Sequence, residues 1–293
     1  MFYLYSPESC VKTVFLLAST VTQQPIQSIT DLKDNYLLFL GKISPDCLPN
    51  RSNNDSEQFC FNTERIKTMA IKYEDDGILT DLKSHIDLYT PLSSMREALK
   101  YVEKGKSLIT KINPSLRQIF DLTIHTLFYT RSTHSGGGSV SDAPGVIWCS
   151  VRRNWTEMDL AEFLVHELTH NFVFLDELCY QHYTDLSALA NEKYYAKSTI
   201  LNKQRPLDKT FHSLVVAHEV LSYRKEAGEP ENPHVHPNSA KMLDSCKETI
   251  SSIKSVIDNN SLVTPRFREI LDKVEVSLQQ LEQSLIPSLS VAL

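Results

Sequence analysis

Residues 160–175 read LAEFLVHELTHNFVFL, and this stretch decides how the rest of the chain is interpreted. Projected at about 100° per residue, its apolar side chains cover nearly the whole circumference of a helix. A helix that is apolar almost all round is buried in a core. Thr156 is placed to cap its N-terminus, with Asp159 at the third helical position. The pattern predicts a buried helix over residues 156–175.

Two segments before this helix have strand composition. Residues 122–130 and 145–151 are rich in β-branched and aromatic side chains, and a Gly/Ser run at residues 135–139 lies between them. A glycine-rich connection predicts an antiparallel pair. The helix at residues 156–175 is then expected to pack across this small sheet. The glycine run lacks the lysine of a phosphate-binding loop, so it is interpreted as a flexible connection.

The rest of the chain is expected to be mostly helical. Further helices are predicted at residues 91–112, 206–226, 239–257 and 265–285. The predicted fold is therefore α+β and mainly helical, with a small antiparallel sheet packed against the helix of residues 156–175. Residues 91–293 are expected to form a metal-binding catalytic domain. Residues 1–90 are a weakly patterned N-terminal region that can belong to the same domain, with a polar loop at residues 50–55.

Composition and charge narrow the classes of function. The chain has 293 residues, of which 41% are hydrophobic and 23% are charged, and this composition is typical of globular proteins. Its 30 Lys+Arg and 36 Asp+Glu give a net charge of −6, which argues against nucleic acid or an anionic membrane as a partner. No apolar run is long enough to span a bilayer, no signal peptide is recognised, and the six cysteines form no C-x-x-C pair. We therefore expect a cytoplasmic protein in a reducing compartment.

The buried helix carries an H-E-x-x-H motif formed by His166, Glu167 and His170. A spacing of four residues places the two imidazoles on one helical face, a turn apart, so that both can bind one metal ion. The alternative is a pair of structural histidines whose ring nitrogens are satisfied by hydrogen bonds. We favour metal binding, because histidines on a buried helix need partners for their ring nitrogens.

The third metal ligand decides the chemistry. An extended metalloprotease pattern would need glycine where the chain has Val173, and it would leave only Asp176 as a ligand. A thermolysin-like site would use a downstream glutamate, and Glu192 lies at a suitable distance in the sequence. The third option is His212, early in the helix predicted at residues 206–226. From the residues alone, Glu192 and His212 both remain open.

Several short segments occur in the order found in a known family. They are the strand at residues 145–151, Leu160-Ala161-Glu162, Val165-His166-Glu167 with His170, Leu175-Asp176-Glu177-Leu178, Tyr194-Tyr195-Ala196, Arg205-Pro206-Leu207 and Phe211-His212-Ser213. Over residues 143–226 the chain resembles the HExxH-motif-containing peptide-modification proteins associated with ribosomally made, post-translationally modified peptides. Members of that family are described as 2-oxoglutarate-dependent peptide β-hydroxylases. The chain departs from it at residues 197–202, where characterised members usually have a proline-containing stretch.

The resemblance implies a mononuclear iron(II) site with His166, His170 and His212 as ligands. Open positions on the iron would accept 2-oxoglutarate and dioxygen. The reaction implied is β-hydroxylation of a precursor peptide. Glu167 would then orient a histidine or a bound water instead of acting as a base.

The co-substrate also needs a cation. The tail carboxylate of 2-oxoglutarate is bound well by a guanidinium, which can grip it with two hydrogen bonds. Arg205 is the first candidate, and Arg152 and Arg153 are the alternatives.

A zinc metallopeptidase is the competing enzyme. Glu167 would be its general base, and Glu192 or His212 would complete the ligand set. A peptide is the expected substrate of either enzyme. The strand at residues 145–151 is expected to pair with that peptide by β-augmentation.

A third hypothesis is a protein without catalytic activity, in which the metal is structural. A closed structural site needs four ligands. Cys179, His182 or His218 would supply the fourth.

Overall fold

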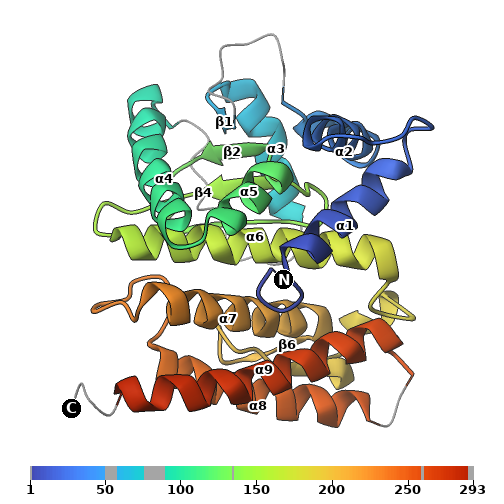
Figure 1. The fold of residues 1–293 in the computed structure, drawn as a ribbon, viewed down its shortest axis with the longest axis vertical. Coiled ribbons are helices and arrows are strands. Elements are labelled where there is room, and N and C mark those ends of the chain that lie inside the picture. The colour runs from blue at the N-terminus through green and yellow to red at the C-terminus, as the bar shows by residue number, and fades with distance from the viewer. Residues whose placement is uncertain (1, 50–57, 76–89, 134, 259–260, 290–293) are drawn as a thin grey trace. The chain divides into compact units, whose positions relative to one another are not determined.

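The structure, a computed structural model, describes residues 2–49, 58–75, 90–133, 135–258 and 261–289 (Figure 1). Its architecture is α+β and mainly helical, which confirms the predicted fold class. The chain divides into two compact units: Pro7–Leu175, called the N-terminal unit, and Met1–Ser6 with Asp176–Leu293, called the C-terminal unit. The described part of residues 7–90 therefore lies in one unit with residues 91–175. The loop predicted at residues 50–55 lies outside the described residues.

The N-terminal unit contains a sheet of short strands. In the described part of the chain these are β1 (Phe59–Cys60), β2 (Thr126–Tyr129), β3 (Gly137–Gly138) and β4 (Val146–Cys149), in the order β1-β2-β4-β3. β1, β2 and β4 are parallel, and β3 is antiparallel to β4. The two strands predicted from the sequence are present and adjacent. The prediction that they pair antiparallel is wrong, because Leu127 faces Ile147 in a parallel register.

The glycine run explains the strand direction. It forms β3, which runs back along the side of β4 that faces away from β2. The chain then returns through residues 139–145, so β4 begins at the same end of the sheet as β2. Gly137 has a φ of +149°, and a Cβ atom there would lie 2.3 Å from the carbonyl oxygen of Trp148. Only glycine tolerates this conformation and this approach.

Helices make up most of the N-terminal unit (Figure 1). They are α1 (Pro7–Ser19), α2 (Ile29–Ile43), the 3-10 turn η1 (Pro45–Cys47), α3 (Thr63–Asp75), α4 (Leu92–Ile112), α5 (Pro114–Thr123) and most of α6 (Glu157–Tyr180). The helix predicted at residues 91–112 is confirmed as α4. On α3, the hydroxyl of Tyr73 donates to the carbonyl of Val146, and its ring packs edge-on against Trp148. α3 therefore covers one face of the sheet.

Helix α6 covers the other face. A Cβ atom on Gly138 would meet the ring of Tyr73, whereas one on Gly137 would meet the ring of Phe163 on α6. Successive positions of a strand point to opposite faces, so the sheet lies between α3 and α6. Thr156 caps α6: its hydroxyl accepts the Asp159 N–H at 3.1 Å, and the Asp159 carboxylate accepts the Thr156 N–H at 2.9 Å. The predicted helix, its cap and its packing on the sheet are confirmed, and α6 continues to Tyr180.

The C-terminal unit contains three long helices, α7 (Leu207–Ala227), α8 (Ser239–Ile257) and α9 (Pro265–Leu289), which pack on one another (Figure 1). They confirm the helices predicted there. The 3-10 turns η2 (Ser187–Ala190) and η3 (Glu192–Tyr194) and an antiparallel pair, β5 (Tyr195–Lys197) with β6 (Gln204–Pro206), precede them. Every side chain of α7 from Thr210 to Arg224 is buried, which makes α7 the core helix of this unit.

None of the described helices combines the length and the apolar character that crossing a membrane would require. The six cysteines all lie in the described part of the chain, and none of them forms a disulfide.

Candidate functional site

His166 and His170 lie one turn apart on α6, and their Nε2 atoms are 3.1 Å apart. Two nitrogen ligands bound to one ion at about 2.1 Å, with angles of about 90–109° at the metal, are about 3.0–3.4 Å apart. The pair therefore has the separation that a shared metal ion requires. A hydrogen bond between neutral imidazoles gives a similar distance, and metal binding by the pair stays a prediction.

Glu167 lies between the two histidines in sequence, and its side chain is buried. Its exposed fraction is 5%, and its Oε2 atom has no hydrogen-bond partner among the described residues. Burial raises the pKa of this carboxyl to about 8, and a hydrogen bond with Ser139 opposes the shift only in part. Without a metal ion Glu167 is therefore largely protonated at neutral pH. Its Oε1 atom lies 3.9 Å from Nε2 of His166.

A buried amide holds this part of α6 against the sheet. Asn171 accepts the N–H of Gly145 at 2.6 Å, and its amide nitrogen donates to the Ser139 hydroxyl at 3.0 Å and to the Glu167 carbonyl at 2.9 Å. The Ser139 hydroxyl donates in turn to the Glu167 carbonyl at 3.3 Å. These bonds fix the turn that carries Glu167. Sequence reasoning missed Asn171, although a polar residue directly after the motif, in an otherwise apolar stretch, is a usable signal.

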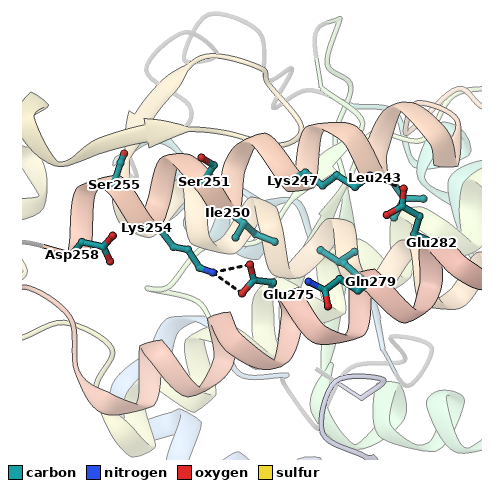
Figure 2. A pocket seen from close by; sticks show the side chains of 11 residues that line it. Leu243, Lys247, Ile250, Ser251, Lys254, Ser255, Asp258, Glu275, Gln279 and Glu282 are labelled. Carbon is teal, nitrogen blue, oxygen red and sulfur yellow. Dashed lines mark hydrogen bonds and ion pairs between the residues drawn. The ribbon is translucent and has the colours of Figure 1, made fainter.

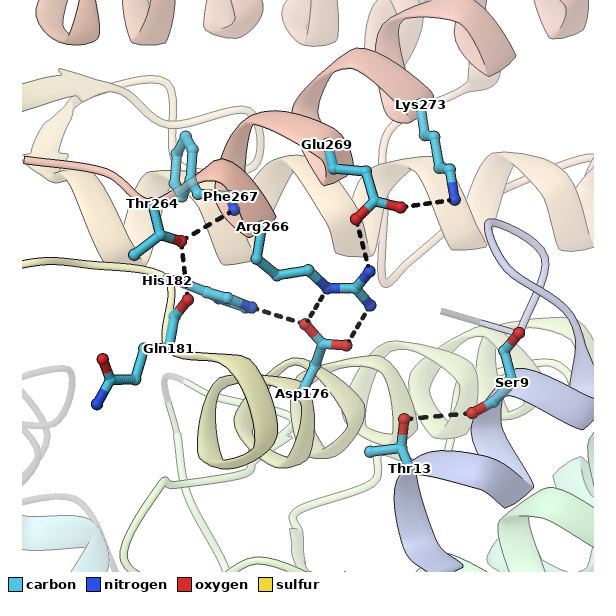
Figure 3. Close-up of polar contacts among 10 residues, drawn as sticks. All are labelled: Ser9, Thr13, Asp176, Gln181, His182, Thr264, Arg266, Phe267, Glu269 and Lys273. Atoms are coloured by element: carbon cyan, nitrogen blue, oxygen red, sulfur yellow. Dashed lines mark hydrogen bonds and ion pairs between the residues drawn. The ribbon is translucent and has the colours of Figure 1, made fainter. Parts of the chain in front are cut away.

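Asp176, the ligand that the extended metalloprotease pattern would need, forms an ion pair instead. Its Oδ1 atom accepts from Arg266 at 2.5 Å, and its Oδ2 atom lies 3.0 Å from Arg266 Nε and 2.8 Å from His182 Nε2 (Figure 3). Burial alone would raise the pKa of Asp176, but the hydrogen bonds with His182 and Arg266 hold it below its ordinary value. The guanidinium of Arg266 also lies over the rings of Tyr5 and Tyr180. The carboxylate of Asp176 is therefore already bound by other side chains of the C-terminal unit.

His212 and Glu192, the two open candidates for the third ligand, belong to the C-terminal unit. His212 is buried on α7. Burial, and then the charge of Lys209, hold its pKa well below its ordinary value, and His182 and Arg205 add to this effect. It is therefore a neutral imidazole, the form that binds a metal. Glu192 is exposed on η3. The place of either residue beside the histidine pair stays a prediction.

No three His, Cys, Asp or Glu side chains within the described ranges are already grouped so that they could hold a metal ion. The candidates for a closed structural site also have other interactions. His182 contacts Asp176, and His218 Nε2 lies 2.7 Å from the hydroxyl of Ser277. Burial raises the pKa of Cys179 to about 11, which disfavours the thiolate that a metal binds.

The three candidate arginines differ in burial. Arg205 is half-buried on β6, and it lies near enough to His212 for its charge to lower the pKa of that imidazole. Arg152 and Arg153 are exposed, and Arg153 pairs with Glu97 at 3.2 Å. A cation that is shielded from water binds a carboxylate more strongly than an exposed one. Burial therefore supports Arg205 as the candidate for the co-substrate carboxylate.

A groove of about 670 Å³ lies between α8 and α9 (Figure 2). None of the predicted site residues lines it. Two of its lysines are already paired: Lys254 donates to Glu275 at 2.6 Å, and Lys247 donates to Glu282 at 2.6 Å. The groove therefore gives no reason to move the candidate site away from α6.

Comparison with known proteins does not assign the chain to a family. No known protein family matches the chain, and no curated protein is similar enough to count as a relative.

Proposed function

We propose that this protein is an oxygenase that uses iron(II) and 2-oxoglutarate to hydroxylate a peptide at a β-carbon. The observation that supports a metal site is the 3.1 Å separation between the Nε2 atoms of His166 and His170. The surroundings of His212 favour 2-oxoglutarate, because Arg205 and Lys209 lie near this buried imidazole. A dicarboxylate co-substrate needs such cations, whereas zinc-dependent peptide hydrolysis does not.

In this proposal His166, His170 and His212 would hold the iron, and Arg205 would bind the distal carboxylate of 2-oxoglutarate. When bound, the iron and its co-substrate supply the oxidising power for attack on an unactivated C–H bond. The protein binds and orients the peptide and excludes water. Glu167 would have a positioning role, in which its buried carboxyl orients a metal-bound histidine or a bound water instead of acting as a base.

A zinc metallopeptidase is the second candidate, and the position of Glu167 favours it. The Oε2 atom has no hydrogen-bond partner among the described residues, and the residue lies on the turn between the two histidines. A general base must have such an oxygen within reach of the proton it removes. Glu167 would then take the proton of the attacking water, once the charge of the bound zinc had lowered the pKa of this carboxyl. The two candidates thus differ in the role of this one carboxyl.

Metal analysis combined with two product assays tests the proposal. Protein purified without chelators is analysed for bound metal and then supplied with iron(II) or zinc, 2-oxoglutarate and a candidate precursor peptide. Release of succinate, together with a peptide heavier by one oxygen atom, supports the oxygenase. Peptide cleavage that needs zinc and Glu167, without succinate, reverses the ranking.

Two variants separate the parts of the site. His212→Ala should lower the metal content and abolish succinate release, whereas His234→Ala, at an exposed histidine of the same unit, should do neither. Arg205→Ala should raise the 2-oxoglutarate concentration needed for turnover. A His212→Ala variant that keeps its metal and its activity would show that the third ligand lies elsewhere, and Glu192→Gln would be the next variant to make.

A further inference from the structure

β3 is one of the two edge strands of the described sheet in the N-terminal unit, and β1 is the other. β3 ends the strand order β1-β2-β4-β3, so within the described residues β4 has a neighbour on each side and β3 has one. The expectation that residues 145–151 pair with a peptide is therefore wrong for β4, because its backbone groups already bond to β2 and β3. Of the two edge strands, β3 is the one beside β4, so on this side of the sheet a further strand can pair only with β3.

The backbone of Gly137 points toward this edge. The N–H of Ser150 donates to the carbonyl of Gly136 at 2.7 Å, which makes these two residues a hydrogen-bonded pair of the antiparallel ladder. Hydrogen-bonded and non-hydrogen-bonded pairs alternate along such a ladder. Gly137 and Cys149 are the next pair, so the N–H and C=O of Gly137 face away from β4.

One hydroxyl occupies both of these outward groups. Ser135 Oγ accepts the N–H of Gly137 at 3.2 Å and donates to the carbonyl of Gly137 at 2.8 Å. A residue of an added strand would make the same two bonds through its own carbonyl and N–H. Ser135 thus holds the place of a backbone partner, and it can give way by a rotation of one side chain.

This edge lies over the turns of α6 that carry the motif. A Cβ atom on Gly137 would meet the ring of Phe163, and Ser139, directly after β3, bonds to the Glu167 carbonyl and to Asn171. Gly136, Gly137 and Gly138 are half-buried and present no side chain that would keep another backbone away. A chain paired with β3 would therefore run beside the segment that bears the two histidines.

We propose that the edge of β3 at Gly137 is the binding site for the peptide substrate, which adds as an extended strand and displaces the hydroxyl of Ser135. This inference rests on the proposed function for its peptide substrate. Recognition through backbone groups selects an extended segment that has a free N–H where it meets Gly137, and it rejects proline at that position.

The test uses a short capped peptide of alternating threonine and valine with a lysine at each end. Backbone pairing tolerates many sequences, so binding of this probe should be detectable when its concentration is raised to the millimolar range. Amide NMR of the metal-free protein should show the resonance of Gly137 shifting as the probe is added. The same peptide with methyl groups on alternate backbone nitrogens should not bind, because it lacks the N–H that the carbonyl of Gly137 accepts.

Ser135→Ala should tighten the binding of the probe by roughly two- to tenfold. In this variant the probe no longer has to displace the hydrogen bonds between the Ser135 hydroxyl and Gly137. Ser132→Ala is the matched control: the Ser132 hydroxyl accepts the N–H of Ser135 in the same turn, whereas the outward groups of Gly137 bond to Ser135, so affinity should stay close to wild type. A Gly137 resonance that does not move, or equal binding of the methylated peptide, would overturn the proposal. The binding needs no metal, so the probe should bind the metal-free protein whatever the metal analysis and the product assays of the proposed function show.

Discussion

Replacing Glu167 by Gln should change how the stability of the metal-free protein depends on pH. Burial holds the pKa of this carboxyl at about 8 in the folded protein, above the ordinary value of 4.5. Between these two pH values the unfolded chain has lost the proton, while the folded protein still holds it. The unfolded state therefore binds fewer protons, and the free energy of unfolding falls as the pH rises.

The size of the effect follows from the two pKa values. Each pH unit in this window costs about 1.4 kcal/mol. From pH 4.5 to pH 8 the wild-type protein should therefore lose about 5 kcal/mol relative to Glu167→Gln, whose amide does not titrate. The side chain is almost completely buried, so solvent screens little of this difference.

Urea unfolding of the wild type and Glu167→Gln, followed by circular dichroism at a series of pH values, measures the difference. Subtraction of the two curves removes the contributions of all groups that titrate alike in both proteins. Glu157→Gln, at an exposed position of the same helix, is the control and should follow the wild type. A constant difference between wild type and Glu167→Gln across this range would refute the argument, since it would mean that the buried carboxyl does not retain its proton.

Three further predictions concern stability. Arg266→Met leaves the buried carboxylate of Asp176 without its cation and should cost about 3 kcal/mol in urea unfolding, most of which the double variant with Asp176→Asn should recover. Gly137→Ala and Gly228→Ala should each lower the free energy of unfolding by about 1–3 kcal/mol through backbone strain. Gly137→Ala should lower it by about 1–3 kcal/mol more, because its Cβ atom also clashes with neighbouring atoms. Equal melting temperatures of the two variants would contradict this. Burial lowers the pKa of His125 to about 4, so the free energy of unfolding should fall by about 3 kcal/mol as the pH drops from 6.5 to 4, and His125→Gln should abolish that slope.

The helices of the C-terminal unit and α6 were predicted because their signals are local. Thr156 and Asp159 cap α6 within one turn, and Asn238 and Thr264 accept the N–H groups of Lys241 and Phe267 at the starts of α8 and α9. Such signals need only a few neighbouring residues, so the printed sequence contains them.

Helix α2 has a similar local signal. The Ser28 hydroxyl accepts the N–H of Asp31, and the buried Leu32, Tyr36 and Leu40 follow at intervals of four residues. This pattern marks one face of a helix. Short polar stretches on either side of this pattern leave the rest of the N-terminal region without a clear period in the sequence.

The motif by itself determined that His166 and His170 share a helical face, because a separation of four residues leaves no other arrangement on an α-helix. The direction of β4 relative to β2 could not be read in the same way. It depends on the chain between the two strands, where Gly137–Gly138 form β3 before the chain returns. The raised pKa of Glu167 and the ion pair between Asp176 and Arg266 likewise became visible only in the tertiary structure. Burial and ion pairing depend on residues far away in the chain, whereas helical spacing depends only on neighbours.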